Sequence, residues 1–127
     1  MSEQGTILVV DDTSSIRVLV GMIVRKMGFQ TMEAGNGLEG MARLKELQAR
    51  RQTPVLVVTD LYMPQMDGVT FIREIRKTDK TTPILMLTTE SYPEKRQEGK
   101  AAGANAWMVK PIESERFATL VRRLTQK

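Results

Sequence analysis

Apolar runs that alternate with amphipathic stretches restrict the possible folds of this chain more than any other feature. Five segments read as strands, at residues 6–10, 29–34, 54–60, 82–89 and 105–110. Five others read as helices, at residues 14–27, 38–50, roughly 67–77, 91–103 and 113–125. Strands that alternate with helices indicate βαβ units, and continuous apolar strands indicate a sheet covered on both faces. We therefore predict an α/β fold with a doubly wound, five-stranded parallel sheet.

Three of the expected helices have apolar residues at helical spacing, which predicts the face that packs on the sheet. These residues are Ile16, Leu19, Ile23 and Met27 in the first; Leu38, Met41, Leu44 and Leu47 in the second; and Phe117, Leu120, Val121 and Leu124 in the last. Gly28 is expected to end the first of these helices, because glycine commonly follows a helix C-terminus.

The helix expected at residues 91–103 is weaker than the others. Ser91 and Glu94 have the spacing of a capping box, and Pro93 suits a first helical turn. After Tyr92 its only apolar residues are alanines, and Gly99 costs about 1 kcal/mol relative to alanine. We expect a loosely held helix, as a regulated surface would have.

Length and composition indicate one soluble globular domain over residues 1–127. The chain is 41% hydrophobic and 27% charged, which suits a packed core rather than a disordered segment. No apolar run approaches the roughly 18–20 residues of a membrane span, and the polar start "MSEQGT" lacks a signal-peptide core. The expected location is the cytoplasm.

The chain contains no cysteine and no histidine. This excludes disulfide scaffolds, thiol nucleophiles, Cys/His zinc sites and any histidine base within the chain. The net charge of +4 comes from basic residues scattered along the sequence, among them the two arginines of "ARR" (49–51), Lys95, Arg96, Lys100, Arg122, Arg123 and Lys127. We interpret them as a solvated basic surface, and direct nucleic-acid binding is not expected because no segment resembles a reading helix.

Polar side chains stand at the carboxyl ends of four of the expected strands. Asp11 and Asp12 follow the first strand directly. Asp60 ends the third, Thr88 stands at the end of the apolar run of the fourth, and Lys110 ends the fifth. The carboxyl ends of parallel strands share one edge, and open α/β folds bind ligands in the crevice there. Three carboxylates without histidine or cysteine suit a hard divalent cation, best Mg²⁺. With Lys110 and Thr88 they form a set suited to phosphoryl transfer onto a carboxylate.

These residues resemble the receiver domain of two-component response regulators over essentially the whole chain. The resemblance rests on "VVDD" (9–12), "TDLYMPQMDG" (59–68), "LTTE" (87–90) and "GANAWMVKP" (103–111), in this order and spacing. Single-domain receivers such as the chemotaxis regulator are the most similar in extent. The resemblance implies a flavodoxin-like sheet with strand order 2-1-3-4-5.

The resemblance also implies a role for each site residue. Asp60 corresponds to the phosphoacceptor, and Asp11, Asp12 and the backbone carbonyl of Tyr62 correspond to the Mg²⁺ ligands together with Asp60. Thr88 corresponds to the switch hydroxyl, and Lys110 to the phosphate-pairing lysine, in a Lys–Pro bond that is usually cis.

Trp107 stands at the aromatic switch position of the family, where tyrosine or phenylalanine is usual. The alternative to a switch role for this residue is plain packing at the edge of an interface. The surface built from residues 91–103, 104–109 and 112–124 corresponds to the output face. Thr89 is bulkier than the residue common at its position, and Tyr62 and Glu90 stand where the family tunes dephosphorylation.

The implied function is a signalling module rather than an enzyme, since it acts only on its own aspartyl phosphate. A histidine kinase or phosphotransfer protein would donate the phosphoryl group, and an unknown protein would read the output face of a monomer or weak dimer. Alternatives are a phosphate sink, a receiver cut from a longer regulator and a phosphorylation-independent binding module. An aspartyl-phosphate hydrolase is disfavoured, because those families have Asp-x-Asp where this chain has adjacent aspartates.

Overall fold

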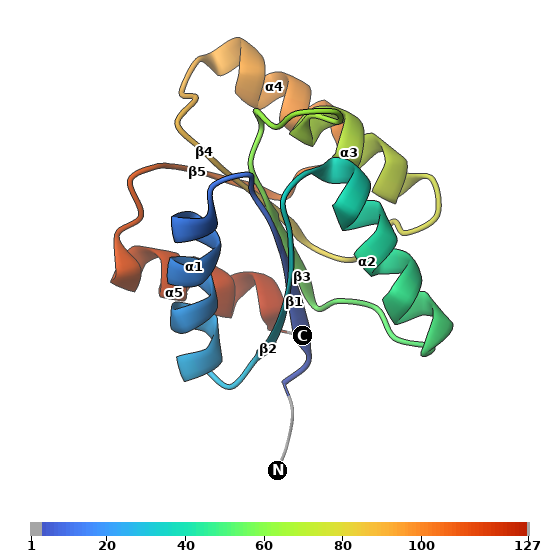
Figure 1. Cartoon of the computed structure of the whole chain (residues 1–127). Coiled ribbons are helices and arrows are strands. Elements are labelled where there is room, and N and C mark those ends of the chain that lie inside the picture. Colours follow the sequence, from blue (N-terminus) through green and yellow to red (C-terminus); the bar gives the residue numbers. More distant parts are fainter. Residues whose placement is uncertain (1–3, 127) are drawn as a thin grey trace.

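The computed structural model describes residues 4–126, so the polar start at residues 1–3 and Lys127 of the expected basic surface lie outside it. Strands and helices alternate along the chain (Figure 1). In order they are β1 (Thr6–Val10), α1 (Ser14–Lys26), β2 (Gln30–Ala34), α2 (Gly37–Ala49), β3 (Leu56–Thr59), α3 (Gly68–Arg76), β4 (Ile84–Thr88), α4 (Pro93–Ala102), β5 (Ala106–Val109) and α5 (Ser114–Thr125). Within residues 4–126, no helix combines the length and hydropathy of a membrane crossing.

The five strands form one parallel sheet in the order β2-β1-β3-β4-β5, which confirms the predicted fold and strand order. The chain passes from β1 outward to β2 and then returns to place β3 on the other side of β1. The strand order therefore reverses at β1 and β3, which is where folds of this type open a ligand crevice at the carboxyl edge.

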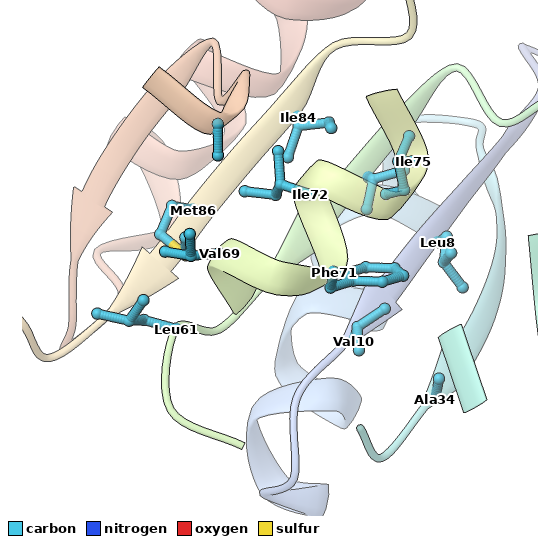
Figure 2. Packing of buried hydrophobic residues seen from close by; sticks show 12 residues of the cluster. Leu8, Val10, Ala34, Leu61, Val69, Phe71, Ile72, Ile75, Ile84 and Met86 are labelled. Carbon is cyan, nitrogen blue, oxygen red and sulfur yellow. The ribbon is translucent and has the colours of Figure 1, made fainter. Parts of the chain in front are cut away.

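Helices cover both faces of the sheet, which explains why its central strands are continuously apolar. Ile7 and Val9 of β1 pack with residues of α1 and α5, while Leu8 and Val10 face the side of α2, α3 and α4. Figure 1 shows α1 and α5 together on one side of the sheet. On the other side, Figure 2 shows α3 lying over the strands, with Phe71 close to Val10 and Leu8. A strand buried on both faces has no polar side to alternate with.

Two predicted helix faces differ from the observed ones. Leu38 in α2 is 52% exposed, so its expected place on the buried face is wrong. The buried positions of α2 are Gly37, Gly40 and Leu47. A Cβ atom on Gly40 would lie 2.7 Å from the ring of Phe71, so this glycine allows α2 to approach α3 closely. Because α2 lies so close to α3, the face of α2 that carries Gly37 and Gly40 points toward the core, and Leu38 points away from it.

In α1 the fully buried side chains are Val20 and Val24, which lie to one side of the row predicted from spacing. The predicted residues are half-buried, namely Ile16, Leu19, Ile23 and Met27. Because α1 contacts both the sheet and α5, its apolar face is wider than the single predicted row.

The start of α4 also differs from the prediction. The expected capping box of Ser91 and Glu94 is wrong, because Tyr92 occupies the N-cap position and its side chain makes no capping hydrogen bond. Pro93 does occupy the first turn, as predicted. The buried residues of α4 are Gly99 and Ala102, so few apolar atoms attach this helix to the core.

The charges separate toward opposite ends of the molecule, although they are scattered in the sequence. The last four residues of each helix and the loops that follow carry eleven basic and three acidic residues within residues 4–126. Basic side chains at helix C-termini complement the helix dipoles. All five helices run antiparallel to the strands, so these residues gather at the edge opposite the strand carboxyl ends. The net charge of +4 therefore does not describe the site, whose surroundings are predominantly acidic.

Candidate functional site

Three carboxylates meet at the carboxyl edge of the sheet. Asp11 directly follows β1 and Asp60 directly follows β3, and their preceding residues Val10 and Thr59 are register partners in neighbouring strands. Carboxylate oxygens of Asp11, Asp12 and Asp60 lie within 4.8 Å of one another. Asp11 is 2% exposed and Asp60 8% exposed, whereas Asp12 is open to solvent. The predicted convergence of these three side chains is confirmed.

Lys110 reaches this cluster from the end of β5. Its Nζ donates to Asp11 Oδ2 at 2.9 Å and to Asp60 Oδ2 at 3.2 Å, and its side chain is 12% exposed. Because β5 is three strands away from β1, only a long side chain can span this distance. The Lys110–Pro111 peptide bond is cis, as expected.

Backbone groups fix the remaining oxygen of each buried carboxylate. Asp60 Oδ1 accepts from the Leu61 N–H at 2.7 Å, and Asp11 Oδ1 accepts from the Thr13 N–H at 2.9 Å. Gly68 brings α3 against the same loop, since a Cβ atom there would lie 2.2 Å from the backbone oxygen of Asp60. The role of Gly68 in this close approach is not predicted from the sequence motif that contains it. The sequence feature that indicates Gly68 is its position directly after Asp67, whose carboxylate caps α3.

The negative charges of the site outnumber the positive charge of Lys110, and burial and the repulsion between carboxylates disfavour the ionised form of Asp11. Burial raises the pKa of the Asp11 carboxyl, and the charge of Asp60 adds to this; the Thr13 N–H and Lys110 oppose the rise without cancelling it. Burial lowers the pKa of Lys110, but its hydrogen bond to Asp11 and the charges of Asp60 and Asp11 outweigh that effect and the net pKa is raised. Lys110 therefore stays an ammonium ion, and one ammonium faces three carboxylates.

Thr88 is the last residue of β4 and is fully buried. Its hydroxyl oxygen accepts from the Glu90 N–H at 3.4 Å. Among residues 4–126, no hydrogen bond joins Thr88 to Asp60, so the switch role implied by the resemblance stays a prediction. Its position at the same strand edge agrees with the sequence prediction.

Glu90 connects the loop after β3, the start of α4 and strand β5. The Tyr62 hydroxyl donates to one carboxylate oxygen of Glu90, and the Tyr92 N–H donates to the other at 3.1 Å. The indole Nε1–H of Trp107 donates to the backbone oxygen of Glu90 at 2.9 Å. Trp107 is half-buried and packs against the core cluster beneath α3 and α4. Trp107 thus has both a packing contact and a hydrogen bond to the loop before α4.

We expect Gly99→Ala to displace the indole of Trp107, because a Cβ atom at Gly99 would lie 2.8 Å from the ring atom Cζ3. Overpacking of this kind costs about 1–3 kcal/mol, against a gain of about 1 kcal/mol in helix propensity. The net result is a protein less stable by about 1 kcal/mol in urea unfolding. Trp107 is the sole tryptophan of the chain, so its fluorescence emission should shift as well.

The matched control is Gly21→Ala, another buried helical glycine. The nearest atoms to a Cβ at Gly21 belong to the flexible end of the Arg25 side chain, which can move aside. This variant should be at least as stable as the wild type. Unchanged emission together with increased stability in Gly99→Ala would contradict the packing explanation for Gly99.

Comparison with known proteins reveals clear similarity. The sequence profile described as "Response regulator receiver domain" matches residues 7–122. The chain is 38% identical over 127 residues to the chemotaxis protein CheY-3 of Vibrio cholerae, covering 98% of this chain and 92% of that protein. It is 32% identical to the chemotaxis protein CheY of Bacillus subtilis, covering 92% and 94% respectively. The structure of the chemotaxis response regulator CheY4 of V. cholerae superimposes with a TM-score of 0.83 at 38% identity, covering 94% of this chain and 98% of that one.

Other relatives are considerably longer than this chain. The chain is 33% identical to the sensor histidine kinase CheAY of Helicobacter pylori and covers 14% of it. It is also 33% identical to the probable transcriptional regulatory protein TcrX of Mycobacterium tuberculosis, and covers 50% of it. Similarity to these proteins therefore concerns one part of each.

Proposed function

The chain belongs to the response regulator receiver family, and we propose that its acidic pocket accepts a single phosphoryl group on Asp60. The observation that supports this choice is the position of Lys110, whose ammonium bridges the Asp11 and Asp60 carboxylates at 2.9 and 3.2 Å. A carboxylate that is 8% exposed lies next to the ammonium group of Lys110, at the site where ligands enter such folds. That combination suits a carboxylate that is to receive a dianionic group.

In the proposed reaction, one carboxylate oxygen of Asp60 attacks the phosphorus atom of a phosphohistidine on a partner protein. The new P–O bond forms as the P–N bond breaks, and the partner's imidazole leaves with the electron pair. Because residues 1–127 contain no histidine, the donor imidazole lies outside this domain, on a histidine kinase or phosphotransfer protein. The Lys110 ammonium would then pair with a phosphoryl oxygen, and the Thr88 hydroxyl would donate to another.

The three carboxylates fit a hard divalent cation, because they offer closely spaced oxygens and no nitrogen or sulfur ligands. We propose that Asp11, Asp12, Asp60 and the backbone carbonyl of Tyr62 hold Mg²⁺. When bound, Mg²⁺ would neutralise charge on the transferring phosphoryl group.

We further propose that phosphorylation acts on the surface formed by α4, β5 and α5. The added charge of about −2 lies beside Thr88 and Lys110, and Thr88 is linked through the Glu90 N–H to the loop that also binds Trp107. The output partner would be a protein, and the domain would work in the cytoplasm as a monomer or weak dimer. It would turn over only its own aspartyl phosphate.

A second candidate is that the same receiver works within a longer regulator. It is favoured by the longer relatives, of which the chain covers 14% and 50%. The length of the native gene distinguishes the two candidates, since the phosphorylation chemistry is the same in both. A phosphate sink would share that chemistry but lack an output partner.

The test is phosphoryl uptake from a small donor such as phosphoramidate, followed by intact-mass measurement and peptide mapping. We expect one Mg²⁺-dependent, hydroxylamine-labile phosphoryl group on the peptide that contains Asp60, and none in excess EDTA. Label on a serine or threonine, or uptake that does not depend on Mg²⁺, would contradict the proposal.

A further inference from the structure

We propose that Arg17 is a positioning residue that orients the Asp11–Asp12 peptide for cation binding. This inference rests on the proposed function, because the cation is the Mg²⁺ of that site. Arg17 lies in the first turn of α1, and its Nη1 donates to the backbone oxygen of Asp11 at 2.5 Å. Its Nε donates to Glu33 Oε1 on β2 at 3.1 Å. One guanidinium therefore joins α1, β2 and the end of β1.

The bonded carbonyl belongs to the peptide unit that leads into Asp12. That unit is planar, so holding the Asp11 oxygen also sets the direction of the Asp12 N–H and restricts where the Asp12 Cα lies. The Asp11 N–H is held as well, since it donates to the Ala34 backbone oxygen at 3.0 Å. Both ends of Asp11 are thus attached to neighbouring elements.

Asp12 depends on this backbone support more than its neighbours do. The carboxylates of Asp11 and Asp60 each accept hydrogen bonds from a backbone N–H and from Lys110. Within residues 4–126, no hydrogen bond or ion pair is made by the Asp12 side chain, which is exposed. Its placement relative to the other two carboxylates therefore comes from the backbone that Arg17 holds.

Arg17 also has a charge effect of opposite sign. It lines the same open hollow as Asp12, of about 450 Å³, so its positive charge repels a cation that approaches the cluster. If charge alone mattered, removing it would strengthen Mg²⁺ binding. If positioning dominates, removing the two hydrogen bonds weakens binding, even when a lysine keeps the charge. The two effects can therefore be separated by Arg17→Met and Arg17→Lys.

The experiment is an Mg²⁺ titration of the full chain by isothermal calorimetry at constant ionic strength. We expect Arg17→Met and Arg17→Lys each to raise the Mg²⁺ Kd by about 10-fold, the effect typical of residues that orient metal ligands. Glu33→Gln, which weakens the outer contact of Arg17, should raise it less. Phosphoryl uptake should be slow at low Mg²⁺ and recover at saturating Mg²⁺, which a disrupted Asp60 would not do.

The matched control is Arg43→Met. Arg43 also contacts Glu33, through the backbone oxygen at 3.2 Å, but lies on α2 and makes no bond to Asp11 within the described residues. The Mg²⁺ Kd of Arg43→Met should match that of the wild type. A cooperative unfolding transition in EDTA should show that each variant is folded without metal. Tighter or unchanged binding in Arg17→Met would overturn the inference while leaving the proposed function intact. Absence of Mg²⁺ binding in the wild type would overturn both.

Discussion

Asp60→Asn is expected to abolish phosphoryl uptake completely. The amide has nearly the same shape as the carboxylate and can still accept from the Leu61 N–H, but it has no anionic oxygen to attack phosphorus. Lys110 keeps its 2.9 Å bond to Asp11, so the pocket should remain assembled. Intact-mass measurement after incubation with phosphoramidate and Mg²⁺ should show unmodified protein only.

The control for this variant is Asp67→Asn, which changes a carboxylate in the same loop. Asp67 caps α3 by accepting from the Thr70 N–H at 2.8 Å, and asparagine caps a helix about as well as aspartate. This variant should take up phosphoryl groups at the wild-type rate. Uptake of one group by Asp60→Asn would refute the assignment of the acceptor.

Asp11→Asn is expected to stabilise the fold in the absence of metal and to eliminate Mg²⁺ binding. Asp11 is 2% exposed and lies beside the like charge of Asp60, so its ionised form is unfavourable in the folded state. Removing that charge should raise the free energy of unfolding by about 1 kcal/mol, within the usual range of single substitutions. In saturating Mg²⁺ the wild type should be more stable than Asp11→Asn, because a ligand at about 100 times its Kd stabilises the protein that binds it by about 2.7 kcal/mol.

The stabilising effect of Asp11→Asn should depend on pH with a definite sign. Because the pKa of Asp11 is raised on folding, the folded state binds more protons than the unfolded state as pH rises through and above the usual value of 3.8. Wild-type stability falls relative to the variant over that interval. The difference in urea unfolding without metal should be near zero in strong acid and largest at neutral pH. A difference that shrinks as pH rises would contradict the stated cause.

The fold was largely predictable because each strand can be identified from its own run of residues. The strand over Ile84–Thr88 is fully buried, and its run of apolar residues was sufficient to identify it. The face of each helix that is buried against its neighbours was less predictable. Leu38 has the right spacing for the core but is exposed, because α2 instead packs through Gly40 against Phe71. Spacing along one helix contains no information about the neighbour that sets its rotation.

The site was predictable where its residues follow strands directly. Asp11, Asp60 and Lys110 could be placed together because parallel strands end at one edge. Arg17 and Gly99 were different. Arg17 is separated from Glu33 by a helix and a turn, and the need for Gly99 arises from an indole on a different strand. Such contacts connect elements whose mutual approach no local pattern specifies.

The parallel sheet, the carboxylate cluster at its edge and the lack of a histidine donor within residues 1–127 could all be read from the amino-acid sequence. They depend on apolar periodicity, on the residues at strand ends and on composition, which are local properties of the chain. Three other features are visible only in the folded molecule. Lys110 bridges Asp11 and Asp60, Glu90 joins Tyr62 to Trp107, and the scattered basic residues gather at one end. These features depend on distances between separate elements, and such distances are set by packing once the whole core has formed.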